Sequence, residues 1–235
     1  MNTDQKMKIY HFLDKHPKIK TTLVAPYRKI MKKYTTHDEK DYNQWIIQNE
    51  PIARELAKQR KHKFAYQPKI SIVIPLYNTK EYFFKEIVEC LKKQTYSNWE
   101  LCLADGSPEP IKYVAKYLKD KRIKYEIIGE NKGISGNTNE AIKLATGDYI
   151  GLLDHDDLLP RFSLYEVVKA INENPETEFL YSDEDRIEGE FHKRYGVFFK
   201  PDFSKYTLRS ANYICHFCVF KKELMEKLRW RKSRI

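Results

Sequence analysis

The chain has 235 residues, 41% of them hydrophobic and 32% charged, with a formal net charge of +10. This composition is typical of a globular protein and excludes a largely disordered one. The excess of Lys and Arg lies near the two ends, whereas residues 70–220 are slightly acidic, which argues against nucleic-acid binding over a broad surface. Four scattered cysteines are too few for a disulfide framework, and no apolar run approaches the ~20 residues of a membrane-spanning helix, so we expect a cytoplasmic protein.

Residues 1–68 are predicted to form a basic, helical N-terminal extension. Apolar side chains recur there at helical spacing, for example at Leu23, Tyr27 and Ile30, and prolines interrupt the segment. One interpretation is a helical cap that packs on the main domain. The other is a basic, aromatic surface that rests peripherally on the anionic inner face of the cell membrane. The two interpretations are compatible.

Residues 69–235 are predicted to form one α/β domain. Its first strand, 69–78, is a nearly continuous apolar run rich in β-branched residues, as expected for a strand covered on both faces. Helical and strand-like segments then alternate, which predicts a mostly parallel, doubly wound sheet with right-handed crossovers. The expected helices are 81–93, 110–119 and 133–146, the last stopped by Gly147, and the further expected strands are 98–107, 122–129 and 149–153.

Polar motifs follow the ends of these strands. They are "PLYN", "ADGS", "ENKG" and "DHDD", at residues 75–78, 104–107, 130–133 and 154–157. Because ligands bind beyond the carboxyl ends of the strands in such sheets, we expect the four motifs to line one binding edge.

The acidic motif "DHDD" predicts a cation site. Asp154 and Asp156 flank one residue, so both can approach the same point if the chain turns after the strand. Carboxylate oxygens suit Mg²⁺ or Mn²⁺, which usually need one or two carboxylates plus substrate phosphates. For Asp157, the cap of a helix that begins near Pro160 is an equal alternative. His216 is expected in the core or facing an acceptor, with a contribution to the metal or diphosphate left open.

The ordered motifs "IVIPLYN", "ADGS", "NKGISGNTNEA", "GDYIGLLDHDD", "YSDEDRI" and "FKPDFSKYTLRSANYICHFCVFKKEL" resemble the GT-A glycosyltransferases of family 2, in the polysaccharide and rhamnan-type branch. The resemblance covers about residues 69–228. It implies a GT-A fold, a nucleotide-sugar donor and a divalent metal. It also implies a nucleotide-sugar site formed by Pro75, Tyr77, Asp105, Asn131, Gly133, Asn139 and Asp154, with the metal on Asp154 and Asp156.

The same resemblance implies the reaction. Family members transfer a sugar, with inversion, from a nucleotide diphosphate to a polysaccharide or lipid-linked acceptor. The sequence departs from the family pattern in two places near the nucleotide, because "ADGS" lacks one Asp and Thr138 replaces an Arg. It also ends before the "GGFR"-like turn and the Asp motif that supplies the general base. Asp183, Glu184 and Asp185 are the remaining acid cluster, and one of them is a weak candidate for that base. The alternative function is therefore a nucleotide-sugar-binding module that transfers sugar poorly or not at all.

Overall fold

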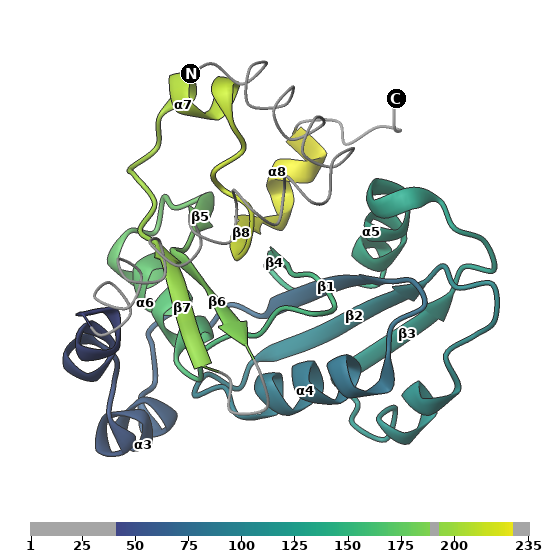
Figure 1. Cartoon of the computed structure of the whole chain (residues 1–235), viewed down its shortest axis with the longest axis horizontal. Helices are drawn as coiled ribbons and strands as arrows, with labels where there is room; N and C mark the ends of the chain where they lie inside the picture. Colours follow the sequence, from purple (N-terminus) through teal and green to yellow (C-terminus); the bar gives the residue numbers. More distant parts are fainter. Residues whose placement is uncertain (1–40, 189–192, 228–235) are drawn as a thin grey trace, which may run out of the picture. The chain divides into compact units, whose positions relative to one another are not determined.

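The computed structural model describes residues 41–188 and 193–227 (Figure 1). The chain divides into two compact units. The described part of the larger contains residues 51–184 and 198–227, and that of the smaller contains residues 41–50, 185–188 and 193–197. The predictions for residues 1–40 lie outside the described residues.

A six-stranded sheet forms the centre of the larger unit, in the order β3-β2-β1-β4-β8-β5. The first four strands along the chain are parallel, β8 is antiparallel to β4, and β5 is antiparallel to β8. The predicted mostly parallel α/β sheet is therefore confirmed. The strands are β1 (Ile70–Leu76), β2 (Trp99–Asp105), β3 (Ile123–Ile127), β4 (Tyr149–Leu152), β5 (Phe179–Tyr181) and β8 (Cys218–Lys221).

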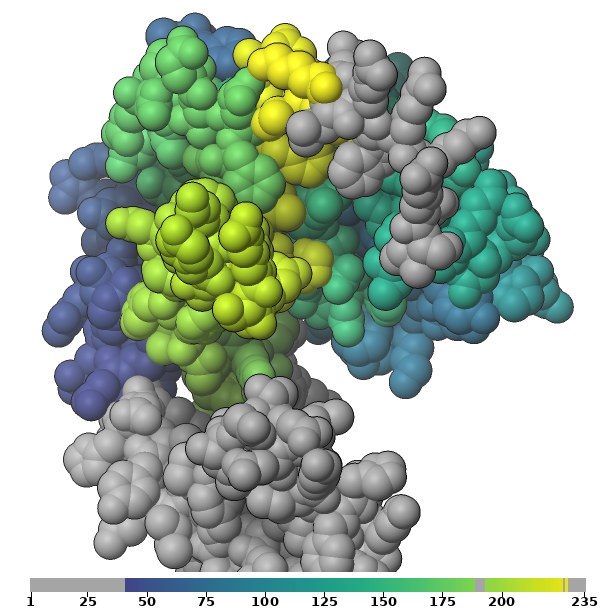
Figure 2. All heavy atoms as spheres, turned by 90° about the horizontal axis from the view of Figure 1, so that it is seen from above, coloured from purple at the N-terminus to yellow at the C-terminus, as the bar shows by residue number. Residues whose placement is uncertain are grey.

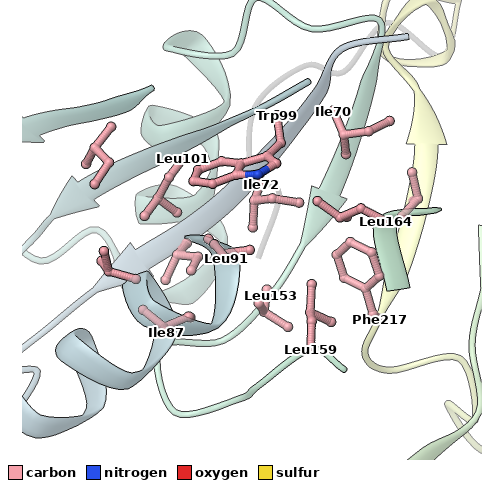
Figure 3. Close-up of a cluster of buried hydrophobic side chains, with 14 of the residues drawn as sticks. Ile70, Ile72, Ile87, Leu91, Trp99, Leu101, Leu153, Leu159, Leu164 and Phe217 are labelled. Carbon is pink, nitrogen blue, oxygen red and sulfur yellow. The ribbon is translucent and has the colours of Figure 1, made fainter. Parts of the chain in front are cut away.

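Helices cover both faces of this sheet, which explains why β1 is apolar throughout. Alternate side chains of β1, such as Ile70 and Ile72, pack in one cluster with α4 (Glu81–Lys92) and α6 (Ser163–Glu173). Val73 points the other way, into a second cluster with α5 (Gly133–Lys143). Figure 1 shows α4 and α5 on opposite faces, and Figure 3 shows the larger cluster.

Two helix predictions are corrected by the structure. The segment 110–119 forms only a short 3₁₀ helix, η1 (Lys112–Lys116). Helix α5 is capped by Leu144, so Gly147 does not stop it. Gly147 instead permits a close backbone approach, because a Cβ atom there would lie 2.4 Å from the carbonyl oxygen of Lys69.

A buried carboxylate ties the amino ends of three strands together. The Glu100 side chain is 1% exposed and pairs with Lys69 and Lys124, whose Nζ atoms lie 2.5 Å and 2.9 Å from Oε2. Its Oε1 accepts hydrogen bonds from Ser71 Oγ and the Thr146 amide. Burial alone would raise the pKa of Glu100, but these partners outweigh it and hold the pKa far below its ordinary range.

Replacing Glu100 with Gln should therefore destabilise the fold. The neutral amide would leave the ammonium groups of Lys69 and Lys124 without their shared carboxylate, and breaking a buried ion pair costs roughly 3–5 kcal/mol. Urea denaturation should show a lower midpoint with an unchanged slope. Glu166→Gln is the matched control, because Glu166 pairs with Lys169 on an exposed helix face. Equal midpoints for the two variants would contradict the bracing role.

Further helices and a separate two-stranded sheet complete the two units. Helix α3 (Ala53–Lys61) contacts the sheet domain through Gln59, whose Oε1 accepts a hydrogen bond from Thr95. The side chains of α7 (Lys205–Ser210), none of them buried, stand at the surface of the larger unit (Figure 2). The others are β6 (Glu184–Glu188), β7 (Lys193–Phe198), which pairs with β6, and α8 (Lys222–Lys227). No helix within residues 41–188 and 193–227 is long and apolar enough to cross a membrane.

Candidate functional site

The acidic loop after β4 is held at both ends by the hydrophobic core. Leu153 is 2% exposed and Leu159 is 8% exposed, and both pack in the larger cluster shown in Figure 3. Gln94, two residues after the end of α4, fixes the end of the loop near Pro160. Its Nε2 donates to the Pro160 carbonyl at 2.8 Å, and its Oε1 accepts a hydrogen bond from the Leu164 amide. The polar residues between the two leucines are therefore presented at a defined place at the carboxyl edge of the sheet.

Antiparallel pairing brings a distant segment against this loop. Leu152 is paired with Cys218, so the residues that precede β8 face the residues that follow β4. As a result, His216 Nε2 lies 3.1 Å from Asp154 Oδ2. The ring of the neighbouring Phe217 packs over Gly151, where an added Cβ atom would lie 2.5 Å from the ring. Gly151 thus makes room for the side chain that anchors this segment.

Three side chains converge at this point. Asp154, Asp157 and His216 each offer one ligand atom, and these atoms all lie within 4.8 Å of one another. Asp156 is exposed and does not belong to this group. The interpretation of Asp157 as a helix cap is wrong, because α6 begins only at Ser163 and Phe162 occupies the cap position.

The electrostatics of the group favour a cation. The hydrogen bond with Asp154 raises the pKa of His216, and the same bond lowers the pKa of Asp154. Burial raises the pKa of Asp157, and the neighbouring charges of Asp154, Asp156 and Glu184 raise it further. A bound cation would therefore offset the cost of ionising Asp157.

The imidazole of His216 is oriented by the backbone. Its Nδ1 lies 3.4 Å from the carbonyl oxygen of Leu152, which can only accept a hydrogen bond, so this contact needs a proton on Nδ1. In the free protein the 3.1 Å contact between Nε2 and Asp154 Oδ2 needs a proton on Nε2, and a cation bound there would replace that proton while the Leu152 carbonyl keeps the one on Nδ1 in place. Nε2 is the atom that faces Asp154, so the ring is arranged as a metal-ligating histidine usually is.

The predicted nucleotide residues of the first two strands lie side by side. Pro75 is opposite Ala104 and Leu76 is opposite Asp105, so Tyr77 follows directly at the carboxyl edge with 44% of its surface exposed. Asp105, by contrast, is fully buried. Its carboxylate accepts hydrogen bonds from the amides of Ser107 and Ile111 and from the hydroxyl of Tyr125. All of these contacts shape the loop after β2.

The loop that leads into α5 is organised by an asparagine that the sequence analysis missed. Asn137 is 3% exposed, accepts a hydrogen bond from the Lys132 amide and donates to Asn131 Oδ1. Gly106 approaches it so closely that a Cβ atom would lie 2.6 Å from Asn137 Nδ2. Asn137 precedes the buried Ala141 by one helical turn, so the two lie on the same face of α5. This spacing could have indicated from the sequence that Asn137 is buried.

The other predicted residues of this loop lie at its surface. Gly133 opens α5 with a φ of +73°, a backbone conformation that favours glycine, and its amide donates to Asn131 Oδ1. Asn131 is exposed and Asn139 is partly buried one position beyond Thr138.

The three weak candidates for the general base have partners in the fold. Asp183 accepts a hydrogen bond from the Lys200 amide, and Glu184 pairs with the Lys200 ammonium. Asp185 belongs to the smaller unit, where it binds Arg194.

Known structures define the class of fold. The S. aureus protein TarS 1-349 in complex with UDP-GlcNAc matches with a TM-score of 0.57 and 19% identity, over 68% of this chain and 47% of that chain. The mannosyltransferase PcManGT from Pyrobaculum calidifontis, in complex with GDP-Man and Mn²⁺, matches with a TM-score of 0.51 and 20% identity, over 74% of this chain and 52% of that chain. The predicted GT-A fold is thereby confirmed.

The family follows from the sequence comparisons. The family model described as glycosyl transferase family 2 matches residues 71–229, and the chain belongs to this family. The chain is 37% identical over 188 residues to the uncharacterized protein y4gI of Sinorhizobium fredii and 32% identical over 194 residues to the O-antigen biosynthesis protein RfbC of Myxococcus xanthus. These alignments cover 78% and 80% of this chain but only 20% and 15% of the relatives, so the chain spans at most a fifth of their length.

Proposed function

We propose that this chain binds a nucleotide-diphosphate sugar together with a divalent cation and acts in the transfer of the sugar to a polysaccharide or lipid-linked acceptor. The observation that carries the proposal is the convergence of Asp154, Asp157 and His216 at the carboxyl edge of the sheet. The match to RfbC, which is named for O-antigen biosynthesis, supports a polysaccharide product. The similar structures of TarS in complex with UDP-GlcNAc and of PcManGT in complex with GDP-Man support a nucleotide-sugar donor.

The spacing of His216 and Asp154 suits two neighbouring ligands of a hexacoordinate divalent cation. In an octahedron, two neighbouring ligand atoms on bonds of about 2.1 Å lie about 3.0 Å apart. The distance between His216 Nε2 and Asp154 Oδ2 is 3.1 Å. Two carboxylates suit Mg²⁺ and Mn²⁺ alike, whereas an imidazole nitrogen favours a transition metal. We therefore propose Asp154, Asp157 and His216 as ligands for Mn²⁺ in preference to Mg²⁺, with Asp156 near the site.

Each part of the edge has its own task in this proposal. Tyr77 contacts the base, and the amides at the start of α5 contact phosphate or ribose. Bound by the three ligands, the cation would offset the negative charge that develops on the departing nucleoside diphosphate. An acceptor hydroxyl that attacks from the opposite face inverts the anomeric carbon and gives its proton to a carboxylate. Asp183 and Glu184 are proposed to brace the site instead of taking this proton.

Calorimetry with Mn²⁺ and then with UDP-, dTDP- and GDP-linked sugars tests binding, and product analysis with a lipid-linked acceptor tests transfer. We expect nucleotide affinity to depend on Mn²⁺ and the product to have the inverted configuration. Mn²⁺-dependent binding without transfer would favour the alternative, a binding module without its general base. Absence of any nucleotide binding would refute both.

The raised pKa of His216 predicts how metal binding depends on pH. Below this pKa the ring is an imidazolium paired with Asp154, so Mn²⁺ must displace a proton. Mn²⁺ affinity should rise by up to about tenfold per pH unit below the raised pKa of His216 and level off above it. Calorimetry in buffers of different ionisation enthalpy should detect the released proton. His216→Gln should bind Mn²⁺ weakly and without this dependence, and an equal slope in both proteins would contradict the assignment.

A further inference from the structure

A buried lysine lies directly behind the segment that carries His216. The side chain of Lys200 is 1% exposed. Its Nζ lies 2.7 Å from the carbonyl oxygen of Ile214, 2.8 Å from that of His216 and 2.9 Å from Glu184 Oε2. An ammonium group has three N–H donors, and here each donor has one acceptor. Lys200 is therefore fully committed to this place in the fold.

The two carbonyl groups lie on either side of an unusual backbone position. Cys215 has a φ of +38°, in the left-handed region that non-glycine residues seldom adopt. Such a conformation is energetically unfavourable and persists only where the surrounding structure determines it. Lys200 holds the carbonyl oxygens of the residues before and after Cys215, so it fixes the turn from which the His216 ring projects.

The lysine is itself held by the segment that follows β5. Its amide donates to Asp183 Oδ1 at 2.7 Å, and its ammonium group pairs with Glu184. The same segment pairs with the chain beyond His216, because the Ser182 amide donates to the Phe217 carbonyl and Ser182 Oγ accepts from the Phe217 amide. The contacts thus connect "YSDE", Lys200 and His216 in one network.

We propose that Lys200 is a positioning residue that places the His216 imidazole beside Asp154 for cation binding. The inference deepens the proposed function, on whose metal site it rests. It assigns a task to the lysine of the "FKPDFS" motif and to the "YSDE" acids. Lys200 itself touches neither the cation nor the donor in this account.

Lys200→Met tests the proposal, since it keeps an unbranched side chain one atom shorter and removes all three donors. In the metal-free protein, NMR of the imidazole nitrogens should show that His216 has lost its hydrogen bond to Asp154. Mn²⁺ affinity should fall about 10–100-fold, as for other residues that orient a metal ligand. Lys200→Arg, which keeps the charge and several donors, should restore part of both signals. If Lys200→Met does not fold, Lys200→Gln, with two amide donors, should show an intermediate loss.

The matched control is Lys124→Met. Lys124 also donates to a carbonyl, that of Leu144, and also pairs with a carboxylate, Glu100, but it lies at the amino end of the sheet. This variant should lose stability while the His216 signals and Mn²⁺ affinity stay unchanged. Unaltered imidazole signals in Lys200→Met would overturn the inference. If the wild-type protein bound no Mn²⁺, the proposed function would fail, and the imidazole signals would still decide the role of Lys200.

Discussion

Asp157→Asn should reduce Mn²⁺ affinity about a hundredfold, equivalent to about 2.7 kcal/mol, whereas Asp156→Asn should change it less than about threefold. The reason is geometric, because Asp157 shares a point with Asp154 and His216 while Asp156 is exposed. The two variants differ by one position and remove the same charge. Long-range electrostatic effects are therefore similar in both.

The stability of the metal-free variant gives an independent check. The ionised form of Asp157 is disfavoured by burial and by its acidic neighbours, which raise its pKa. Asparagine removes this cost, so Asp157→Asn should unfold at an equal or higher urea concentration than the wild type. Calorimetry and urea denaturation on the same samples would measure both effects. Comparable Mn²⁺ affinities for Asp156→Asn and Asp157→Asn would show that the acid pair had been assigned wrongly.

Gly151→Ala should destabilise the protein by about 1–3 kcal/mol, the usual cost of an oversized side chain in a packed core. The added methyl group would lie 2.5 Å from the ring of Phe217, which is 5% exposed. Because Phe217 adjoins His216, displacement of its ring should also weaken Mn²⁺ binding, by about tenfold.

A second substitution tests whether the collision with the Phe217 ring causes the loss of stability. Gly151→Ala combined with Phe217→Leu gives the methyl group space, so the double variant should be more stable than the sum of the single effects predicts. Urea denaturation measures the coupling. Additive losses would mean that Gly151 and Phe217 do not compete for the same space.

The sequence predicted the edge of the sheet that carries the site, because apolar strands ending in polar motifs are a local signal. The apolar stretch of residues 149–153, which leads into Asp154, indicated both a buried strand and the acids that follow it. Which acid turns inward is not local information. It depends on the path between Leu153 and Leu159, both fixed by core packing. The spacing of Asp154 and Asp156 therefore suggested that pair, whereas the structure groups Asp154 with Asp157 and His216.

His216 was harder to assign because its partners lie far away in the sequence. Only the antiparallel pairing of β8 with β4 brings it to Asp154. Similarly, Gly147 was interpreted as a helix stop. The structure shows instead that a side chain at this position would collide with the carbonyl oxygen of Lys69, which directly precedes β1. Long-range packing decided both positions, and neither had a distinctive local pattern.

Anomalous diffraction from crystals grown with Mn²⁺ and a nucleoside diphosphate would test the central claim most directly. We expect one manganese peak within bonding distance of Asp154, Asp157 and His216, with diphosphate oxygens completing the coordination. A peak on Asp156 without Asp157, or nucleotide density with no metal at these three side chains, would contradict it.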